Sequence, residues 1–339
     1  MEDQPPASLI LPRQARLLIA VRTFRIILAM LIAALSANSS AHSRTNESTL
    51  GMVLYNQLKL DLAIRELKKE ADSGNVNSQY YFAEALRKRS RYMTAEAQQW
   101  YETAANNGSI FAMIQLGRQN DDLCRKMTNC PASKKSSADW LIQAKKMASS
   151  TDPPESSYLM YEITFDRTWL EKSANAGYAL AQYWMAVGDR QGEGFFLIPG
   201  KRDEAISKWL KASSEGGNPK AMMEYIEILY KKGDLDGVRH WLQAAAETGD
   251  QKAISSYGSY IAHAPDQVGY PLDLVKGYAL ISLLKELDGG GAIQDFVQDT
   301  LEEIGSKMTP KQIESSKAVA EQWKTSHPPL SFFPEKLGR

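Results

Sequence analysis

The chain has 339 residues, of which 43% are hydrophobic and 24% are charged, and this composition excludes general disorder and provides ample material for a continuous core. Its 40 basic and 40 acidic side chains cancel, so no global field favours nucleic acid or anionic lipid as a partner. We therefore expect a folded protein that binds no nucleic acid.

The first predicted element is an export segment. An apolar run over residues 26–35 follows a segment with four arginines and precedes small and polar residues that end at Ala41. This order is typical of a secretory signal peptide, and the run is shorter than the roughly 20 residues that span a bilayer. We predict that residues 1–41 are a cleaved signal peptide, with an uncleaved membrane anchor as the alternative, and that residues 42–54 are a linker.

An internal repeat begins after the linker, in which a tryptophan is followed eight residues later by a glycine. The tryptophan, the apolar residue after it and the small residues of the next turn share one face of a helix. The glycine ends that helix, because the chain must often enter the left-handed region there. A recurring position in a repeat indicates packing between units. The four pairs are Trp100 and Gly108, Trp169 and Gly177, Trp209 and Gly217, and Trp241 and Gly249.

Two degenerate copies extend this repeat. One ends at Gly74 and carries Glu66 in the place of the tryptophan, and the other, around Trp140, has Ala148 in the place of the glycine. The spacing of all the copies fits a repeat of about 35 residues, and it predicts about six helix pairs over residues 55–263.

Two further signals concern helix boundaries and the end of the chain. Asn218 and Pro219 are typical of an N-cap and a first helical residue, so they predict the start of a helix. Beyond the repeats we predict a helical cap over residues 264–326 and a tail over residues 327–339.

The sequence contains two cysteines, Cys124 and Cys130, which are six positions apart. In an exported protein such a pair is readily oxidised, so we predict a structural disulfide that closes an insertion before the unit of Trp140. The alternatives are a metal site and two free thiols. Zinc prefers four ligands and no histidine lies nearby, whereas free thiols are expected if the chain is not exported.

The segments 96–108 and 203–212 resemble the Sel1-like repeat family, relatives of the tetratricopeptide repeat, and residues 179–183 resemble the family's opening helix. Residues 273–287 and 307–313 resemble the closing helices of many bacterial members. The resemblance covers roughly two thirds of the chain. It implies an all-α fold, a right-handed α-solenoid of about six helix pairs with C-terminal capping helices.

The resemblance also implies a class of function, because Sel1-like proteins with signal peptides in Gram-negative bacteria include immunity proteins paired with lipase effectors of type VI secretion. It implies a periplasmic, non-enzymatic protein whose partner is another protein, and most specifically an immunity protein that neutralises a secreted phospholipase-type toxin. The alternative is a cell-envelope scaffold or adaptor for an assembly or polysaccharide export complex. Contact with a membrane is expected only through an uncleaved amino-terminal segment.

The sequence contains no known catalytic motif. The four histidines are scattered, and the sequence contains no zinc-protease helix, nucleophile elbow, P-loop or dinucleotide fingerprint. We therefore expect no enzymatic activity, no cofactor and no metal site.

Candidate partner-binding residues lie where the repeat is interrupted and on the predicted first helices. An apolar run inside a glycine-bounded loop, residues 195–199, is expected either to meet a partner or to fold back onto its own solenoid. Tyrosines on the predicted first helices are expected to reach the concave face. The candidates are Phe195, Phe196, Leu197, Ile198, Tyr81, Tyr158 and Tyr183.

Overall fold

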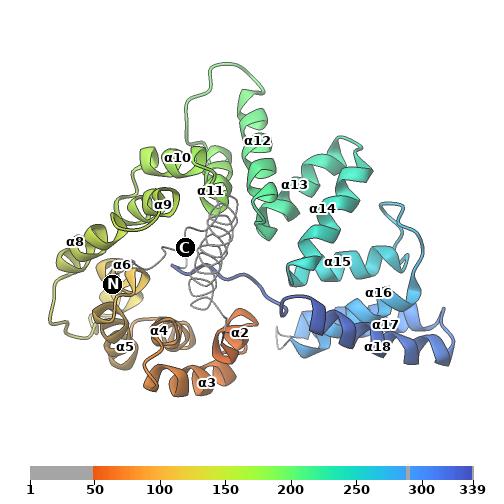
Figure 1. Cartoon of the computed structure of the whole chain (residues 1–339), viewed down its shortest axis with the longest axis horizontal. Coiled ribbons are helices and arrows are strands. Elements are labelled where there is room, and N and C mark those ends of the chain that lie inside the picture. The colour runs from red at the N-terminus through yellow and green to blue at the C-terminus, as the bar shows by residue number, and fades with distance from the viewer. Residues whose placement is uncertain (1–48, 288–290, 338–339) are drawn as a thin grey trace, which may run out of the picture. The chain divides into compact units, whose positions relative to one another are not determined.

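The computed structural model describes residues 49–287 and 291–337, which form helices joined by turns and loops, with no strand among them (Figure 1). The predicted signal peptide and residues 42–48 lie outside the described residues. Within the described ranges, no helix combines the length and apolar character needed to cross a membrane. The predicted all-α solenoid is confirmed.

The helices pack in consecutive pairs, and each pair packs on the next, so the core continues from unit to unit. The pairs are α3 (Leu60–Asp72) with α4 (Val76–Ser90), α5 (Ala95–Asn106) with α6 (Ile110–Gly117), α8 (Ser137–Ala148) with α9 (Pro153–Thr164), α10 (Arg167–Asn175) with α11 (Ala179–Arg190), α12 (Lys201–Glu215) with α13 (Pro219–Lys231), and α14 (Leu235–Glu247) with α15 (Gln251–Ile261).

A further helix precedes these pairs. The boundary predicted for the linker is wrong, because α2 (Leu50–Asn56) begins inside it and packs on α3. Thr49 caps this helix by accepting a hydrogen bond from the backbone N–H of Met52, and Tyr55 is 1% exposed. The apolar face of α2 therefore extends the core towards the amino terminus.

In the repeats with a half-buried tryptophan, the deepest position is the residue after it. Leu170 and Leu210 are fully buried, whereas Trp169 and Trp209 are half-buried. Each of these two tryptophans packs against two neighbouring core clusters. The aliphatic residue thus fills a unit, and the tryptophan joins that unit to the one before it.

The unit around Trp140 is offset by one residue from the predicted alignment. Trp140 is 2% exposed and has fully buried Ala144 one helical turn later, as Leu170 has Ala174. Trp140 therefore takes the deep position that leucine or tyrosine takes elsewhere, and it does not align with the half-buried tryptophans.

The repeat glycines follow the C-cap residues of their helices and have positive φ angles. Gly177 has a φ of 90°, and no heavy atom lies within 4 Å of the position that a Cβ would take, so only the backbone conformation requires glycine there. Gly249 has a φ of 86° and is also packed against the segment that follows α18. A Cβ at Gly249 would lie 2.5 Å from the carbonyl oxygen of Pro329. The N-cap predicted at Asn218 is confirmed by its side chain, which accepts from the N–H groups of Lys220 and Ala221.

The insertion between α6 and α8 contains η2 (Gln119–Asp121) and the short helix α7 (Leu123–Lys126). The predicted disulfide between Cys124 and Cys130 is present, with its Cα atoms 4.7 Å apart. Asp122 ties this insertion to the solenoid, because its Oδ1 accepts from the backbone N–H of Cys124 at 3.0 Å and from that of Met93 at 2.8 Å.

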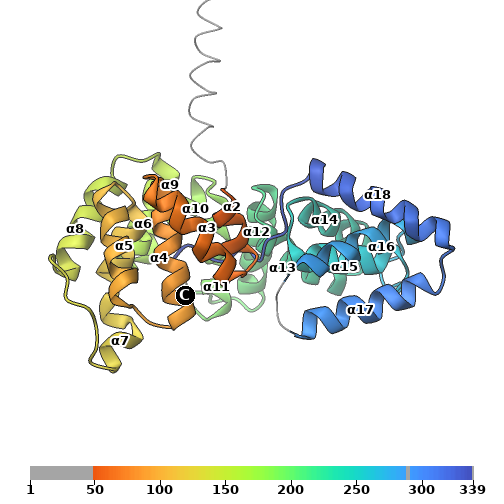
Figure 2. The same cartoon turned by 90° about the horizontal axis from the view of Figure 1, so that it is seen from below.

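The carboxyl-terminal helices cover the last pair. α16 (Leu274–Leu283) runs into η3 (Leu284–Glu286) and packs against α15, α17 (Gly291–Gly305) and α18 (Pro310–Ser326) (Figure 2). After α18 the chain returns to the solenoid as an extended segment, so the residues predicted as a tail are packed.

Candidate functional site

The loop between α11 and α12 presents apolar side chains to solvent. Phe195, Leu197 and Ile198 are 86%, 80% and 61% exposed, so the expectation that this run folds back onto the solenoid is wrong for these residues. Phe196 differs from them, because it is half-buried and the guanidinium carbon of Arg202 lies 4.8 Å from the centroid of its ring. Three apolar side chains thus project from an anchored loop.

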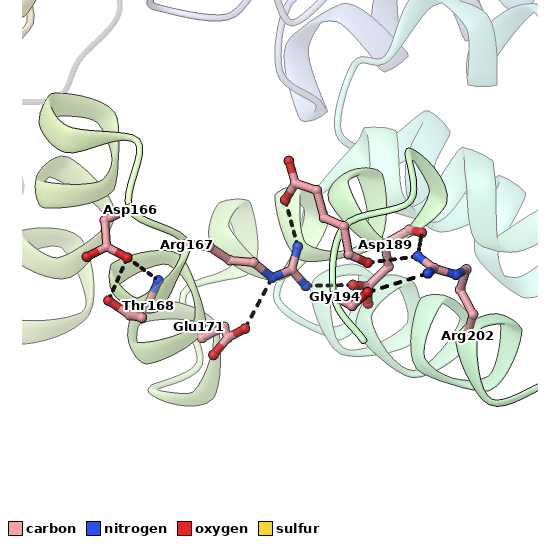
Figure 3. A network of polar contacts seen from close by, with 8 residues as sticks. Asp166, Arg167, Thr168, Glu171, Asp189, Gly194 and Arg202 are labelled. Carbon is pink, nitrogen blue, oxygen red and sulfur yellow. Dashed lines mark hydrogen bonds and ion pairs between the residues drawn. The ribbon is translucent and has the colours of Figure 1, made fainter. Parts of the chain in front are cut away.

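A network of ion pairs fixes the base of this loop (Figure 3). The guanidinium of Arg167, on α10, donates to Asp189 on α11 at 2.6 Å, to Glu193 in the loop at 2.7 Å and to Glu171 at 3.1 Å. One guanidinium therefore joins two helices to the start of the loop, in the multidentate geometry for which arginine is suited.

Arg202, in the first turn of α12, fixes the same loop from its other side. Its guanidinium donates to the backbone carbonyl oxygens of Asp189 at 2.5 Å and Glu193 at 2.7 Å, with a longer contact to that of Gly194 at 3.5 Å (Figure 3). One of these carbonyls belongs to the last turn of α11 and the other two belong to the loop, so Arg202 joins the end of the helix to the loop. The backbone at the start of the loop is therefore held from two helices.

The electrostatics of this network reflect its burial. Asp189 is 1% exposed, and burial raises the pKa of its carboxyl group, while hydrogen bonding and the charges of Arg167 and Arg202 lower it only in part. Burial also disfavours the charged guanidinium of Arg167, but its hydrogen bonds to Glu193 and Asp189 outweigh that effect, and the pKa is raised overall. Asp189 is therefore a buried carboxylate whose charge is balanced by a partly exposed guanidinium.

A second candidate surface is a cavity of about 680 Å³ whose lining draws on the second helices of successive pairs, α4, α6, α9, α11 and α13. Tyr81 and Tyr158 line it, and they lie on the second helices of their pairs and not on the first helices where the sequence places them. Tyr183 lies outside its lining, and its hydroxyl donates to the carboxylate of Glu224 at 2.9 Å. The structure thus brings together two of the three tyrosine candidates.

The walls of this cavity combine aromatic rings with charges of both signs. Phe111 and Tyr178 add rings, and Glu155, Glu162 and Lys220 add charges. Glu162 is 2% exposed and forms an ion pair of 2.8 Å with Arg118. Such a lining suits a peptide that carries both apolar and charged side chains.

The remaining wall of the cavity is the chain's own segment 333–337. Sequence reasoning missed this segment and the Arg167 network. The signal for the segment is its composition, since a solvated tail rarely contains two phenylalanines, a proline and a leucine within six residues. No comparable signal identifies Arg167 and Asp189, whose contact depends on how α10 and α11 pack.

The described residues also lack the arrangement of side chains that a metal site requires. Among residues 49–287 and 291–337, no group of three or more His, Cys, Asp or Glu side chains is arranged to hold a metal ion. The arrangement on the described surface provides apolar contact at the loop and mixed aromatic and charged contact in the cavity.

Neither a protein-family model nor a curated protein matches this chain. Several solved structures are similar to it, and two of them are Sel1-repeat proteins. One is a Sel1 repeat protein from Oxalobacter formigenes, with 18% identity, a TM-score of 0.40, and 86% of this chain and 90% of that chain covered. The other is a protective antigen present in uropathogenic Escherichia coli strains that displays an SLR fold, with 16% identity, a TM-score of 0.32, and 78% and 72% of the two chains covered. The α-solenoid described above is defined by this chain's own helix pairs.

Proposed function

We propose that this chain is a non-enzymatic protein-binding solenoid that contacts its partner through Phe195, Leu197 and Ile198. The observation that carries the proposal is the exposure of these three side chains on a loop whose base is fixed by Arg167 and Arg202. Clustered exposed apolar groups are unfavourable in water unless a partner covers them. A loop that is already held in place loses little conformational entropy when it binds.

The more specific proposal is a periplasmic immunity protein that neutralises a phospholipase-type toxin of type VI secretion. The disulfide between Cys124 and Cys130 supports an oxidising compartment. The resemblance of the sequence to exported Sel1-like proteins supports the class of partner. A phospholipase must accommodate acyl chains in an apolar cleft, and an apolar loop is suited to fill such a cleft and exclude the lipid.

A second candidate function is a cell-envelope scaffold. It is favoured by the presence of two separate surfaces, the exposed loop and the cavity lined by Tyr81 and Tyr158, because an adaptor must hold two partners together. The result expected for this alternative is copurification with envelope assembly proteins and not with a lipase.

The experiment is a protection assay in Gram-negative cells that express a periplasm-directed phospholipase effector, chosen because it binds the purified chain. Cells that express the chain with its amino-terminal segment are expected to survive, and cells that express residues 42–339 in the cytosol are not. The triple variant Phe195→Ser, Leu197→Ser, Ile198→Ser is expected to lose protection. The matched control is Ile142→Ser, which removes a side chain of 68% exposure on α8 and is expected to protect fully.

Two outcomes contradict the proposal. Equal protection by the cytosolic and exported forms contradicts the periplasmic assignment. Full protection by the triple loop variant, with a folded structure shown by circular dichroism, contradicts the assignment of the loop as the contact.

A further inference from the structure

The segment that follows α18 lies against the solenoid as an extended peptide. The backbone N–H of Ser331 donates to the carbonyl oxygen of Gly249 at 2.9 Å, and the carbonyl oxygen of Ser331 accepts from the N–H of Gln251 at 3.1 Å. The N–H of Phe332 then donates to the carbonyl oxygen of Asn56, at the end of α2, at 2.9 Å. Main-chain hydrogen bonds therefore hold the segment against the start of α15 and the end of α2.

Side chains at three consecutive positions hold the rest of the segment. The carboxylate of Glu335 pairs with the ammonium group of Lys220 at 2.9 Å. The ammonium group of Lys336 lies 4.5 Å from the ring centroid of Phe111, a cation–π geometry. Leu337 is 7% exposed and belongs to the core cluster that α2 to α9 form. An acidic, a basic and an aliphatic side chain thus each have a defined site.

The segment does not fill the whole groove. A cavity of about 680 Å³ lies beside residues 333–337, and Tyr81 and Tyr178 are among the residues that line it. The Glu335–Lys220 pair is partly solvated, with side chains 26% and 30% exposed, and such pairs contribute at most about 1 kcal/mol. The charged contact is therefore specific in chemistry but weak, and Leu337 and the main-chain hydrogen bonds hold the segment more firmly.

We propose that residues 331–337 are an internal ligand of this groove, and that a protein partner inserts an extended segment with the same acidic, basic and aliphatic order in its place. The inference rests on the proposed protein-binding function and adds the chemistry of a second contact. A tethered segment competes at an effective concentration of about millimolar, so it screens out weak ligands. A partner must therefore bind the groove more tightly than the tethered segment does, so the segment increases the selectivity of the groove.

The test uses the full chain and a capped peptide with the sequence of residues 330–337, labelled with a fluorophore. The tail-release variant Glu335→Ala, Leu337→Ala is expected to bind the peptide at least about tenfold more tightly than the wild type, because the occupied fraction of the groove limits apparent affinity. A peptide with the acidic and basic residues exchanged is expected to bind at least about tenfold more weakly to the release variant. The matched control, Glu314→Gln in an exposed pair on α18, is expected to behave like the wild type.

A charge reversal separates recognition from a merely structural role. In the tail-release background, Lys220→Glu is expected to weaken binding of the original peptide and to favour a peptide with lysine at the position of Glu335. Circular dichroism and thermal melting verify that each variant is folded. If the release variant unfolds, Lys220→Glu in the otherwise unchanged chain replaces it, with the same reversal of peptide preference expected.

Equal peptide affinity for the wild type and the release variant overturns the inference, as does the absence of binding to both. A wild-type dimer that exchanges its carboxyl-terminal segments between copies also overturns the internal assignment. The loop variants in the protection assay test the proposed function separately, so that function can stand while the internal ligand fails.

Discussion

Arg167 and Asp189 form an ion pair across two helices, with a guanidinium nitrogen 2.6 Å from the carboxylate Oδ1, and Asp189 is only 1% exposed whereas Arg167 is 22% exposed. Arg167→Met removes the positive charge and leaves a buried carboxylate, which is expected to reduce the free energy of unfolding by about 3 kcal/mol. Asp189→Asn in the same chain is expected to recover part of that loss. Urea denaturation of the two single variants and the double variant measures the coupling.

The stability of the Arg167→Met variant is also expected to depend on pH. Burial already raises the pKa of Asp189, and the loss of Arg167 raises it further, so the folded state binds a proton more tightly than the unfolded state. Stability is then lost as the pH rises through the folded pKa. The deficit of Arg167→Met relative to the wild type should therefore be smaller at about pH 4 than at about pH 7. A pH-independent deficit contradicts the assignment of a buried charge.

Two repeat glycines are expected to differ in their tolerance of alanine. Gly177→Ala forces a side chain into the left-handed region with no steric conflict, and it should cost about 1 kcal/mol. Gly249→Ala has the same backbone penalty and also places its Cβ 2.5 Å from the carbonyl oxygen of Pro329. We expect a larger loss of stability and faster hydrogen exchange at Ser331 in Gly249→Ala. Equal losses for the two variants argue against a packed carboxyl-terminal segment.

The helix stops of the repeat were predictable because glycine conformation is a local property of the chain. The fold class was predictable for the same reason, since helix periodicity and spacing reveal stacked pairs. The offset at Trp140 was not predictable, because a tryptophan can fill either the deep or the bridging position of a unit. The different exposure of Phe195 and Phe196 was also not predictable, since it depends on Arg202 packing against the ring of Phe196.

Reduction of the disulfide is expected to have a modest effect. The bond joins residues with a sequence separation of six, and closing a loop of that size contributes about 2 kcal/mol in the chain-entropy account. Dithiothreitol should lower the urea midpoint of the wild type by a corresponding amount. The variant Cys124→Ala, Cys130→Ala serves as the control and should not respond to the reductant. A response of that double variant would assign the effect to something other than this bond.

Alkaline pH is expected to destabilise the cavity walls. Burial and the charge of Glu84 raise the pKa of Tyr81 to about 12, and burial and the charge of Glu155 raise that of Tyr178 to about 12. In the unfolded state tyrosine ionises near pH 10, so stability present below about pH 10 is lost as the pH rises towards about 12. Each tyrosine contributes at most about 1.4 kcal/mol per pH unit. Urea denaturation across this range should show a shallower decline for Tyr81→Phe and for Tyr178→Phe.

The segment that ends at Leu337 has a consequence for how the protein is made. Leu330 belongs to the core cluster of the carboxyl-terminal helices, and Leu337 belongs to the cluster that begins at Met52. A growing chain therefore exposes α2 to α9 long before the residue that fills their remaining core position has been synthesised. Helical repeats normally fold by local steps along the chain. Here the first half acquires its final packing only after residues 330–337 leave the ribosome or the translocation channel, so the emergence of this segment is itself a step in folding.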